Sequence, residues 1–297
     1  MLSITEAVEL IRSGEVVAFP SETVYGIGCD PLNVAAAERI FILKNRPADM
    51  PLSLHVSDPE QAEPFTADMP AEALKLIEHF WPGPLALIVR RSELLPARVT
   101  GGRDTVSLRC PDHPVCLEFL QQLGSPVAGT SANRSAGLSP TRVEDVMAEM
   151  PGVPVLDGGP CSRGIESTIV DLTTQPFRIL RQGVLEHARI AELLPGLARE
   201  ETAPLRPPVL RSRVTLFRPG GEITPADSFV LLSLGSQVPG ARHVINMPDD
   251  PGEYARQLYA ALRQAEALGC DEIVIELPVT DEPAWSAVLA RLKKLKN

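Results

Sequence analysis

The chain has no long apolar run, no paired cysteines and no excess of basic residues, and each absence excludes a class of protein. No stretch of its 297 residues approaches the roughly 18 to 20 consecutive apolar residues that span a bilayer. The five cysteines are scattered, odd in number and without a CxxC pair, so we expect reduced thiols and neither a disulfide framework nor a structural zinc site. The net charge of −10 argues against a dedicated nucleic-acid-binding protein, which usually carries a basic footprint.

Common nucleotide-binding and hydrolytic motifs are also missing. Gly26 and Gly28 follow an expected strand, but Pro31 stands where the third glycine of a dinucleotide-binding fingerprint belongs. No GxxxxGK[ST] loop, GxSxG elbow or HExxH helix occurs. Residues 1–15 carry acidic side chains and have the pattern of a helix, not of a signal peptide. These observations predict a cytoplasmic protein in which any nucleotide is bound by a different device.

The pattern that is present is a mixture of helices and strands without a fixed repeat, which predicts an α/β fold with a mixed sheet in residues 1–200. Strands are expected at 15–19, 51–56, 85–91, 105–110, 125–129, 167–172 and 177–181, and helices at 33–44, 71–81, 114–123 and 142–149. A small Rossmann-like β/α domain is expected at 222–297, with strands at 229–235 and 272–277 and helices at 253–269 and 283–296.

Residues 201–221 differ in composition from both flanking regions. They contain four prolines and four arginines, and no acidic residue lies between Glu201 and Glu222. Such a proline-rich segment predicts a linker between two domains.

Polar side chains gather where the expected strands end. The stretch FPSETVYGIG (19–28) places two hydroxyls and a carboxylate at a strand tip, just before glycines that allow close backbone approach. In 105–110, alternation puts Thr105, Ser107 and Arg109 on one face, a set suited to a carboxylate or a phosphate. An ordinary solvated sheet face has the same pattern, and the lone His55 is equally open to a structural interpretation.

Three further segments share this character. Lys44 and Arg46 end the first long helix just before Pro47, where cations also complement the helix dipole. The loop GTSANRSAG (129–137) offers hydroxyls and backbone N–H groups among small residues, as an anion site does. Ser167 and Arg181 stand near the ends of two later strands.

The ordered set of these motifs resembles the L-threonylcarbamoyl-AMP synthase family in its longer, two-domain form. The resemblance is dense over residues 1 to about 190 and loose beyond, and it rests on FPSETVYGIG, KNRP, LSLHV, SLRCPDHP, GTSANRSAG, STIVDL and RQG. It implies a twisted sheet with an open, cationic cavity and an enzyme that forms L-threonylcarbamoyl-AMP and pyrophosphate from L-threonine, bicarbonate or CO2, and ATP. It also implies that Mg2+ arrives with ATP and that the protein itself holds no metal.

The resemblance further implies a place for the product. A separate tRNA threonylcarbamoyl transferase complex would receive it for threonylcarbamoyladenosine formation, so direct tRNA binding by this chain is expected to be weak at most. No association with a membrane is expected.

The site residues carried over by the resemblance fall into two groups. Lys44 and Arg46 would be catalytic, gripping phosphates or bicarbonate. Threonine would be bound by Thr23, His55, Arg109, Thr130 and Ser167, with Arg109 on its carboxylate. ATP would be bound by Lys44, Arg46, Met50, Thr105, Ser131, Ala132, Asn133, Ser139 and Arg181.

The chain departs from the family pattern at three places. Ser21 replaces a usual threonine and keeps the hydroxyl, whereas Met50 replaces a common asparagine and removes a polar contact to ATP. The usual His-Tyr-Ala-Pro stretch of the linker is replaced by SRVTLFRP, so we expect Arg211, Arg213 or Arg218 to reach phosphate in its place. A merely solvated basic linker is the alternative.

Two other functions remain open at this stage. One is a noncatalytic RNA-binding module, which the net charge disfavours. The other is a related enzyme that forms a carbamoyl-adenylate, although that family adds zinc-finger segments and this chain has no CxxC pair.

Overall fold

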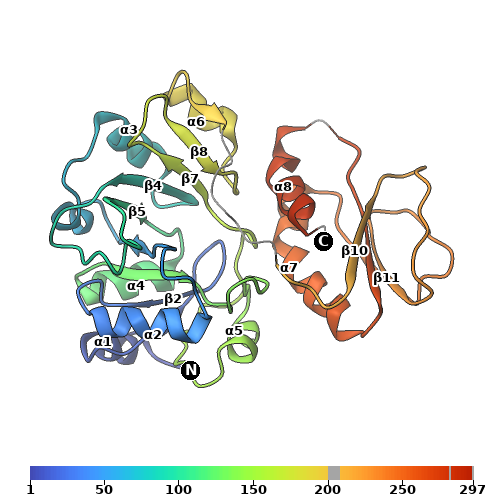
Figure 1. The fold of residues 1–297 in the computed structure, drawn as a ribbon, viewed down its shortest axis with the longest axis horizontal. Helices are drawn as coiled ribbons and strands as arrows, with labels where there is room; N and C mark the ends of the chain where they lie inside the picture. The colour runs from blue at the N-terminus through green and yellow to red at the C-terminus, as the bar shows by residue number, and fades with distance from the viewer. Residues whose placement is uncertain (200–207, 281, 296–297) are drawn as a thin grey trace. The chain divides into compact units, whose positions relative to one another are not determined.

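The computed structural model describes residues 1–199, 208–280 and 282–295, and the chain divides into two compact units (Figure 1). The first unit comprises Met1–Ser135, Ser139–Ser162 and Glu166–Ala203. The second comprises Ala136–Leu138, Arg163–Ile165 and Pro204–Asn297. Two short segments of the N-terminal region therefore belong to the second unit, while the expected domain limits at 200 and 221 stay a prediction.

A mixed sheet forms the centre of the first unit. Among the described residues its strands are β1 (Val17–Phe19), β2 (Gly26–Cys29), β3 (Ser53–His55), β4 (Leu85–Arg90), β5 (Thr105–Arg109), β6 (Val127–Ser131), β7 (Thr168–Asp171), β8 (Arg178–Arg181) and β9 (Ala198–Arg199). Their order is β1-β2-β6-β3-β5-β4-β7-β8-β9, in which β3 and β5 are parallel and β6 is antiparallel to β3. This confirms the expected α/β class with a mixed sheet.

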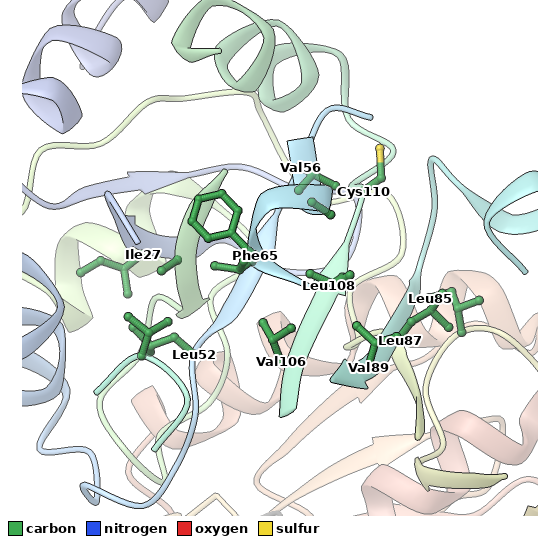
Figure 2. Packing of buried hydrophobic residues seen from close by; sticks show 14 of the residues in the cluster. Ile27, Leu52, Val56, Phe65, Leu85, Leu87, Val89, Val106, Leu108 and Cys110 are labelled. Atoms are coloured by element: carbon green, nitrogen blue, oxygen red, sulfur yellow. The ribbon is translucent and has the colours of Figure 1, made fainter. Parts of the chain in front are cut away.

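Helices pack on both faces of this sheet (Figure 1). They are α1 (Ile4–Arg12), α2 (Val34–Lys44), α3 (Ala71–Phe80), α4 (Pro114–Leu123), α5 (Val143–Glu149) and α6 (His187–Leu193), with a 3-10 turn η1 (Glu60–Phe65). Apolar residues of α1 and α4 pack on one face against Phe19 and Val127. The larger core lies on the other face, where Val106 and Leu108 of β5 pack beside Leu87 of β4 (Figure 2).

Local sequence accounts well for the position of α2. The side chain of Asn33 accepts a hydrogen bond from the N–H of Ala36, so it caps the helix where the pattern predicts its start. The apolar spacing in 33–44 predicts that Val34, Ile40 and Phe41 face inward. Ile40 and Phe41 are buried, whereas Val34, the first residue of the helix, is 47 % exposed. The helix delivers Lys44 to the core at its C-terminal end.

The second unit contains a four-stranded, all-parallel sheet in its described residues. It consists of β10 (Arg213–Phe217), β11 (Phe229–Ser233), β12 (His243–Asn246) and β13 (Glu272–Glu276), in the order β10-β13-β11-β12. Helices α7 (Pro251–Ala267) and α8 (Ser286–Lys294) lie on one side of it, with a 3-10 turn η2 (Pro283–Trp285) before α8 (Figure 1).

The expected linker differs from the structure at its C-terminal end. Residues 201–207 lie outside the described part of the chain, but Arg213–Phe217 form strand β10 along β13. Val214 and Leu216 alternate with the polar Arg213 and Thr215, but this short pattern was masked by the neighbouring prolines and arginines, which dominate the composition of that segment. No helix in the described ranges is long and apolar enough to cross a membrane.

Candidate active site

The parallel pairing of β3 with β5 brings two predicted threonine-binding residues together. His55 lies directly opposite Arg109, and Ser53 lies opposite Ser107, with a 3.0 Å hydrogen bond between the two serine hydroxyls. Directly paired residues of neighbouring strands point to the same face of a sheet, and so do residues two apart on one strand. Ser53, His55, Ser107 and Arg109 therefore form one polar strip. The strip is the face that alternation in 105–110 predicts.

Arg109 is bound by a carboxylate that the sequence analysis did not assign to the site. Its Nη2 lies 2.6 Å from Oε2 of Glu22, and both side chains are nearly inaccessible, at 7 % and 2 %. Its Nε also donates to the carbonyl oxygen of Gly83 at 3.4 Å. The guanidinium expected to meet the carboxylate of an amino acid thus already faces a carboxylate of the protein.

His55 is buried and electrically neutral at physiological pH. Burial and, to a smaller extent, the positive charge of Arg109 lower its pKa to about 3, while hydrogen bonds with the main chain of Val127 and Ser53 act in the opposite direction. Its ring meets that of Phe19 edge-on, with centroids 5.2 Å apart. Within the described residues, its Nδ1 has no hydrogen-bond partner.

A second buried histidine stands beside this group. His113 precedes α4 and is 8 % exposed, and its Nδ1 also lacks a partner in the part of the chain that the structure describes. Burial lowers its pKa, while contact with Gly158 and the charge of Glu22 act in the opposite direction. Gly158 is needed there because a Cβ would lie 2.4 Å from Cε1 of the His113 ring.

The loop before β2 is fixed by its own hydroxyls. The Ser21 hydroxyl donates to the carbonyl oxygen of Val24 at 2.6 Å and lies 3.0 Å from the Thr23 hydroxyl. Ser21 and Thr23 are both buried. The loop therefore presents Glu22 and Thr23 in a defined conformation, and the hydroxyl kept by Ser21 is what closes the turn.

Gly26 and Gly28 serve packing, because both lie within strand β2 and neither has a positive φ. A Cβ on Gly28 would lie 2.3 Å from Cγ1 of Val127, and one on Gly26 would lie 2.7 Å from Cζ of Phe19. The side chains that approach these two glycines closely are therefore Val127 and Phe19.

Strand β6, which lies between β2 and β3, carries two further predicted residues. Thr130 pairs with Ile27, and Ser131 pairs with Gly26. Because side chains alternate along a strand, Thr130 lies on the opposite face from the polar strip of His55 and Arg109. Thr130 is partly exposed there.

Lys44 lies beneath the chain that follows β6. Its ammonium group donates to the backbone carbonyl oxygens of Ser131 and Asn133, and the residue is 1 % exposed. Burial lowers its pKa well below the ordinary lysine value, and the positive charge of Arg46 adds to this. Ala132 is fully buried between the two, with its N–H donating to the carbonyl oxygen of Tyr25 at 2.8 Å.

Arg46 organises the turn that follows α2. Its Nε donates to the carbonyl oxygen of Met50 at 3.2 Å, and its Nη2 donates to that of Pro51 at 2.7 Å. Burial lowers the pKa of Arg46 to about 10, so it remains charged near neutrality. Met50 takes part through its main chain, which explains how the turn tolerates methionine.

The remaining predicted residues are held by hydrogen bonds around β5, β7 and β8. Arg181 donates to both the carbonyl and the hydroxyl oxygen of Ser167, each at 2.9 Å. The Ser139 hydroxyl donates to Glu166 at 2.8 Å. Thr105 begins β5 opposite Arg90, at the other end of the strand from Arg109. The open, cationic cavity expected from the resemblance stays a prediction.

Sequence reasoning missed Glu22 and His113 as members of the cluster around Arg109. Both lie inside segments that were singled out, FPSETVYGIG and SLRCPDHP, so a signal was present. In the described ranges, no group of three or more His, Cys, Asp and Glu side chains has an arrangement that would hold a metal ion. All five cysteines are buried free thiols.

Comparison with known proteins gives matches over both units. The family described as "Telomere recombination" (Sua5/YciO/YrdC) matches residues 9–183, and the family described as "Threonylcarbamoyl-AMP synthase, C-terminal domain" matches residues 210–294. The threonylcarbamoyl-AMP synthase of Pyrococcus abyssi is 35 % identical, over 97 % of this chain and 92 % of its own length. That of Bacillus subtilis is 38 % identical, over 69 % of this chain and 62 % of its own length.

A solved structure extends the likeness to three dimensions. The crystal structure of Pyrococcus abyssi Sua5 complexed with L-threonine superimposes with a TM-score of 0.90 at 33 % identity. The match covers 98 % of this chain and 93 % of that one.

Proposed function

This chain belongs to the threonylcarbamoyl-AMP synthase family, and we propose that it forms L-threonylcarbamoyl-AMP from L-threonine, bicarbonate or CO2, and ATP. The enzyme is a nucleotidyltransferase that serves tRNA modification. The observation that carries this conclusion is the likeness to the Pyrococcus abyssi protein across both units, a protein whose structure was solved with L-threonine bound. The product passes to a tRNA threonylcarbamoyl transferase complex, and any direct contact of this chain with tRNA is weak.

The reaction has two steps, formation of a carbamate on threonine and transfer of AMP to that carbamate. The threonine ammonium group first gives one proton to water; the resulting amine forms an N–C bond with CO2 and releases a second proton to water, which gives a carbamate. A carbamate oxygen then attacks the α-phosphorus of ATP, and the bond to the leaving pyrophosphate breaks. Both partners of the second step are anions, so catalysis depends on masking charge and holding geometry.

The proposed threonine site consists of Thr23, His55, Arg109, Thr130 and Ser167, of which Thr130 is assigned from the resemblance alone, since its side chain points to the other face of the sheet from His55 and Arg109. The short strand pairing between His55 and Arg109 and the hydrogen bond from Arg181 to Ser167 support the assignment of these three. Arg109 binds the amino-acid carboxylate. The neutral ring of His55 offers a hydrogen bond without adding charge.

The proposed ATP site uses the cations at the end of α2 and the chain after β6. Lys44 and Arg46 mask charge on phosphates or bicarbonate. The hydrogen bonds from Lys44 to the carbonyl oxygens of Ser131 and Asn133 support this assignment, because they hold the chain after β6 next to the end of α2. Thr105, Ser139 and Arg181 bind the nucleotide, and Met50 contributes only its main chain. Mg2+ enters with ATP, bound mainly by phosphate oxygens and water.

The test is pyrophosphate release from ATP with bicarbonate, comparing L-threonine, L-serine and no amino acid. We expect strong release with L-threonine that falls by at least about tenfold in Arg46→Ala, because a phosphate-facing cation is lost. Arg39→Ala is the matched control, since Arg39 lies on α2 but pairs with Glu15 at the surface. Release that does not depend on an amino acid would contradict the proposed function.

A further inference from the structure

Several buried polar atoms near Arg109 have no hydrogen-bond partner among the described residues. In the described residues, Oε1 of Glu22 and Nδ1 of both His55 and His113 have no hydrogen-bond partner. The three residues are at most 8 % exposed. Burying an unpaired polar group costs free energy, and most buried polar atoms in proteins are therefore satisfied. A cluster of exceptions at one place indicates a polar ligand.

The cluster contains one positive and one negative side chain in contact with each other. Arg109 presents a positive group and Glu22 a negative one, in contact at 2.6 Å. Removing both charges from water is expensive, and a buried ion pair rarely stabilises a fold by itself. The pair leaves one carboxylate oxygen of Glu22 uncommitted beside the histidines, so the negative end of the pair is able to accept hydrogen bonds.

We propose that Glu22 receives the α-ammonium group of a free amino acid while Arg109 receives its carboxylate. This inference rests on the proposed function and deepens it, because it names the ligand as the zwitterion. An amino acid carries its ammonium and carboxylate groups on the same carbon atom, and Arg109 and Glu22 likewise place opposite charges side by side. The zwitterion matches the pair charge for charge, and the buried complex remains neutral overall.

The neighbours of Glu22 fit this role. Thr23 is buried beside it and Ser21 locks the turn, so the carboxylate is held in place before any ligand arrives. Burial lowers the pKa of both His55 and His113, which disfavours their charged forms, so neither ring is favoured as a cation that would compete with an ammonium group for Glu22. The ordinary alternative is that Glu22 only fixes the position of Arg109.

The experiment measures binding of two ligands, L-threonine and the analogue in which a hydroxyl replaces its α-amino group. Calorimetric titration without ATP is done for the wild type and Glu22→Gln. We expect Glu22→Gln to weaken threonine binding by about 10- to 100-fold, since a charge-assisted hydrogen bond is lost, and to change analogue binding by less than about threefold. An equal loss for both ligands would show that Glu22 acts only through Arg109 and would overturn the proposal, as would no loss for either.

Two controls keep the result interpretable. Glu15→Gln alters a surface carboxylate and is expected to change neither affinity. If Glu22→Gln does not fold, Glu22→Asp is used, which keeps the charge but shortens the side chain by one methylene. The ratio of the Kd for the analogue to the Kd for threonine should then be smaller than in the wild type. An unchanged ratio would overturn the proposal. Binding is measured without ATP, so its outcome is separate from threonine-dependent pyrophosphate release, which tests the proposed function.

Discussion

His55 illustrates how a single buried residue couples stability to pH. Its folded-state pKa of about 3 lies below the ordinary value of 6.5, mainly because burial disfavours the charged ring. The unfolded chain therefore binds a proton at His55 below pH 6.5 while the folded chain does not. Stability contributed by the neutral ring is present above pH 6.5 and is lost as the pH falls toward 3.

We predict that His55→Gln reduces the acid sensitivity of the protein. The wild type should lose up to about 1.4 kcal/mol more unfolding free energy per pH unit than the variant between pH 6 and 4, because one additional proton is taken up on unfolding. Urea unfolding at pH 7, 6, 5 and 4 measures this difference. His79→Gln, at an exposed histidine, is the control. A difference in unfolding free energy between wild type and His55→Gln that does not change with pH would contradict the prediction.

At the same scale, the residue types of the site were predictable but their partners were not. The cations Lys44 and Arg46 and the polar face of 105–110 follow from helix ends and strand alternation, which are local. The pairing of Glu22 with Arg109 joins segments far apart in the chain, as does the contact of Lys44 with the carbonyl oxygens of Ser131 and Asn133. These contacts form only when the strands and helices have assembled in their final order, and that order cannot be deduced from a local sequence pattern.

At the level of elements, strand β2 was not predicted because glycine has a low strand propensity. Gly26–Cys29 nevertheless pairs with β1 on one side and β6 on the other. Tertiary packing overrides the propensity, since Phe19 and Val127 fill the space that larger side chains would need. Helix α2, by contrast, has a capping residue and an apolar face and was located to within a residue.

We predict that Gly28→Ala destabilises the protein by about 1–3 kcal/mol, because the new methyl group overpacks the face of β2. A Cβ there would lie 2.3 Å from Cγ1 of Val127, so Val127→Ala should relieve the clash. Unfolding of the two single variants and the double variant forms a thermodynamic cycle. We expect the double variant to lose at least about 1 kcal/mol less than the sum of the single losses, and strict additivity would contradict this account.

At the level of the whole molecule, the composition separated two regions but did not reveal how the chain divides. Ala136–Leu138 and Arg163–Ile165 belong to the second unit although they lie within the N-terminal region. Within that unit, Arg263 of α7 donates to the carbonyl oxygen of Leu138, and a Cβ on Gly164 would lie 2.4 Å from the carbonyl oxygen of Ala255. Such contacts depend on the completed fold, so no reading of neighbouring residues predicts them.

Arg213, the first residue of strand β10, also has a partner that its local sequence does not reveal. The sequence suggested that this arginine reaches phosphate, but its Nε and Nη2 donate to both carboxylate oxygens of Glu272, at 3.1 and 2.8 Å. Glu272 is fully buried and also accepts from Thr215 and from the N–H of Ala226 at 2.5 Å. Arg211 and Arg218 are exposed, and their contact with phosphate stays a prediction.

We predict that Arg213→Ala lowers the thermal unfolding midpoint by several degrees and leaves the KM for ATP unchanged. The reason is that removing the guanidinium of the edge strand β10 leaves the buried carboxylate of Glu272, on the inner strand β13, without its cation. Arg242→Ala, at an exposed arginine of the same unit, should change neither quantity. A raised KM for ATP with an unchanged unfolding midpoint would indicate that Arg213 contacts a phosphate of ATP. The expected result instead shows that Arg213 stabilises the fold of the second unit.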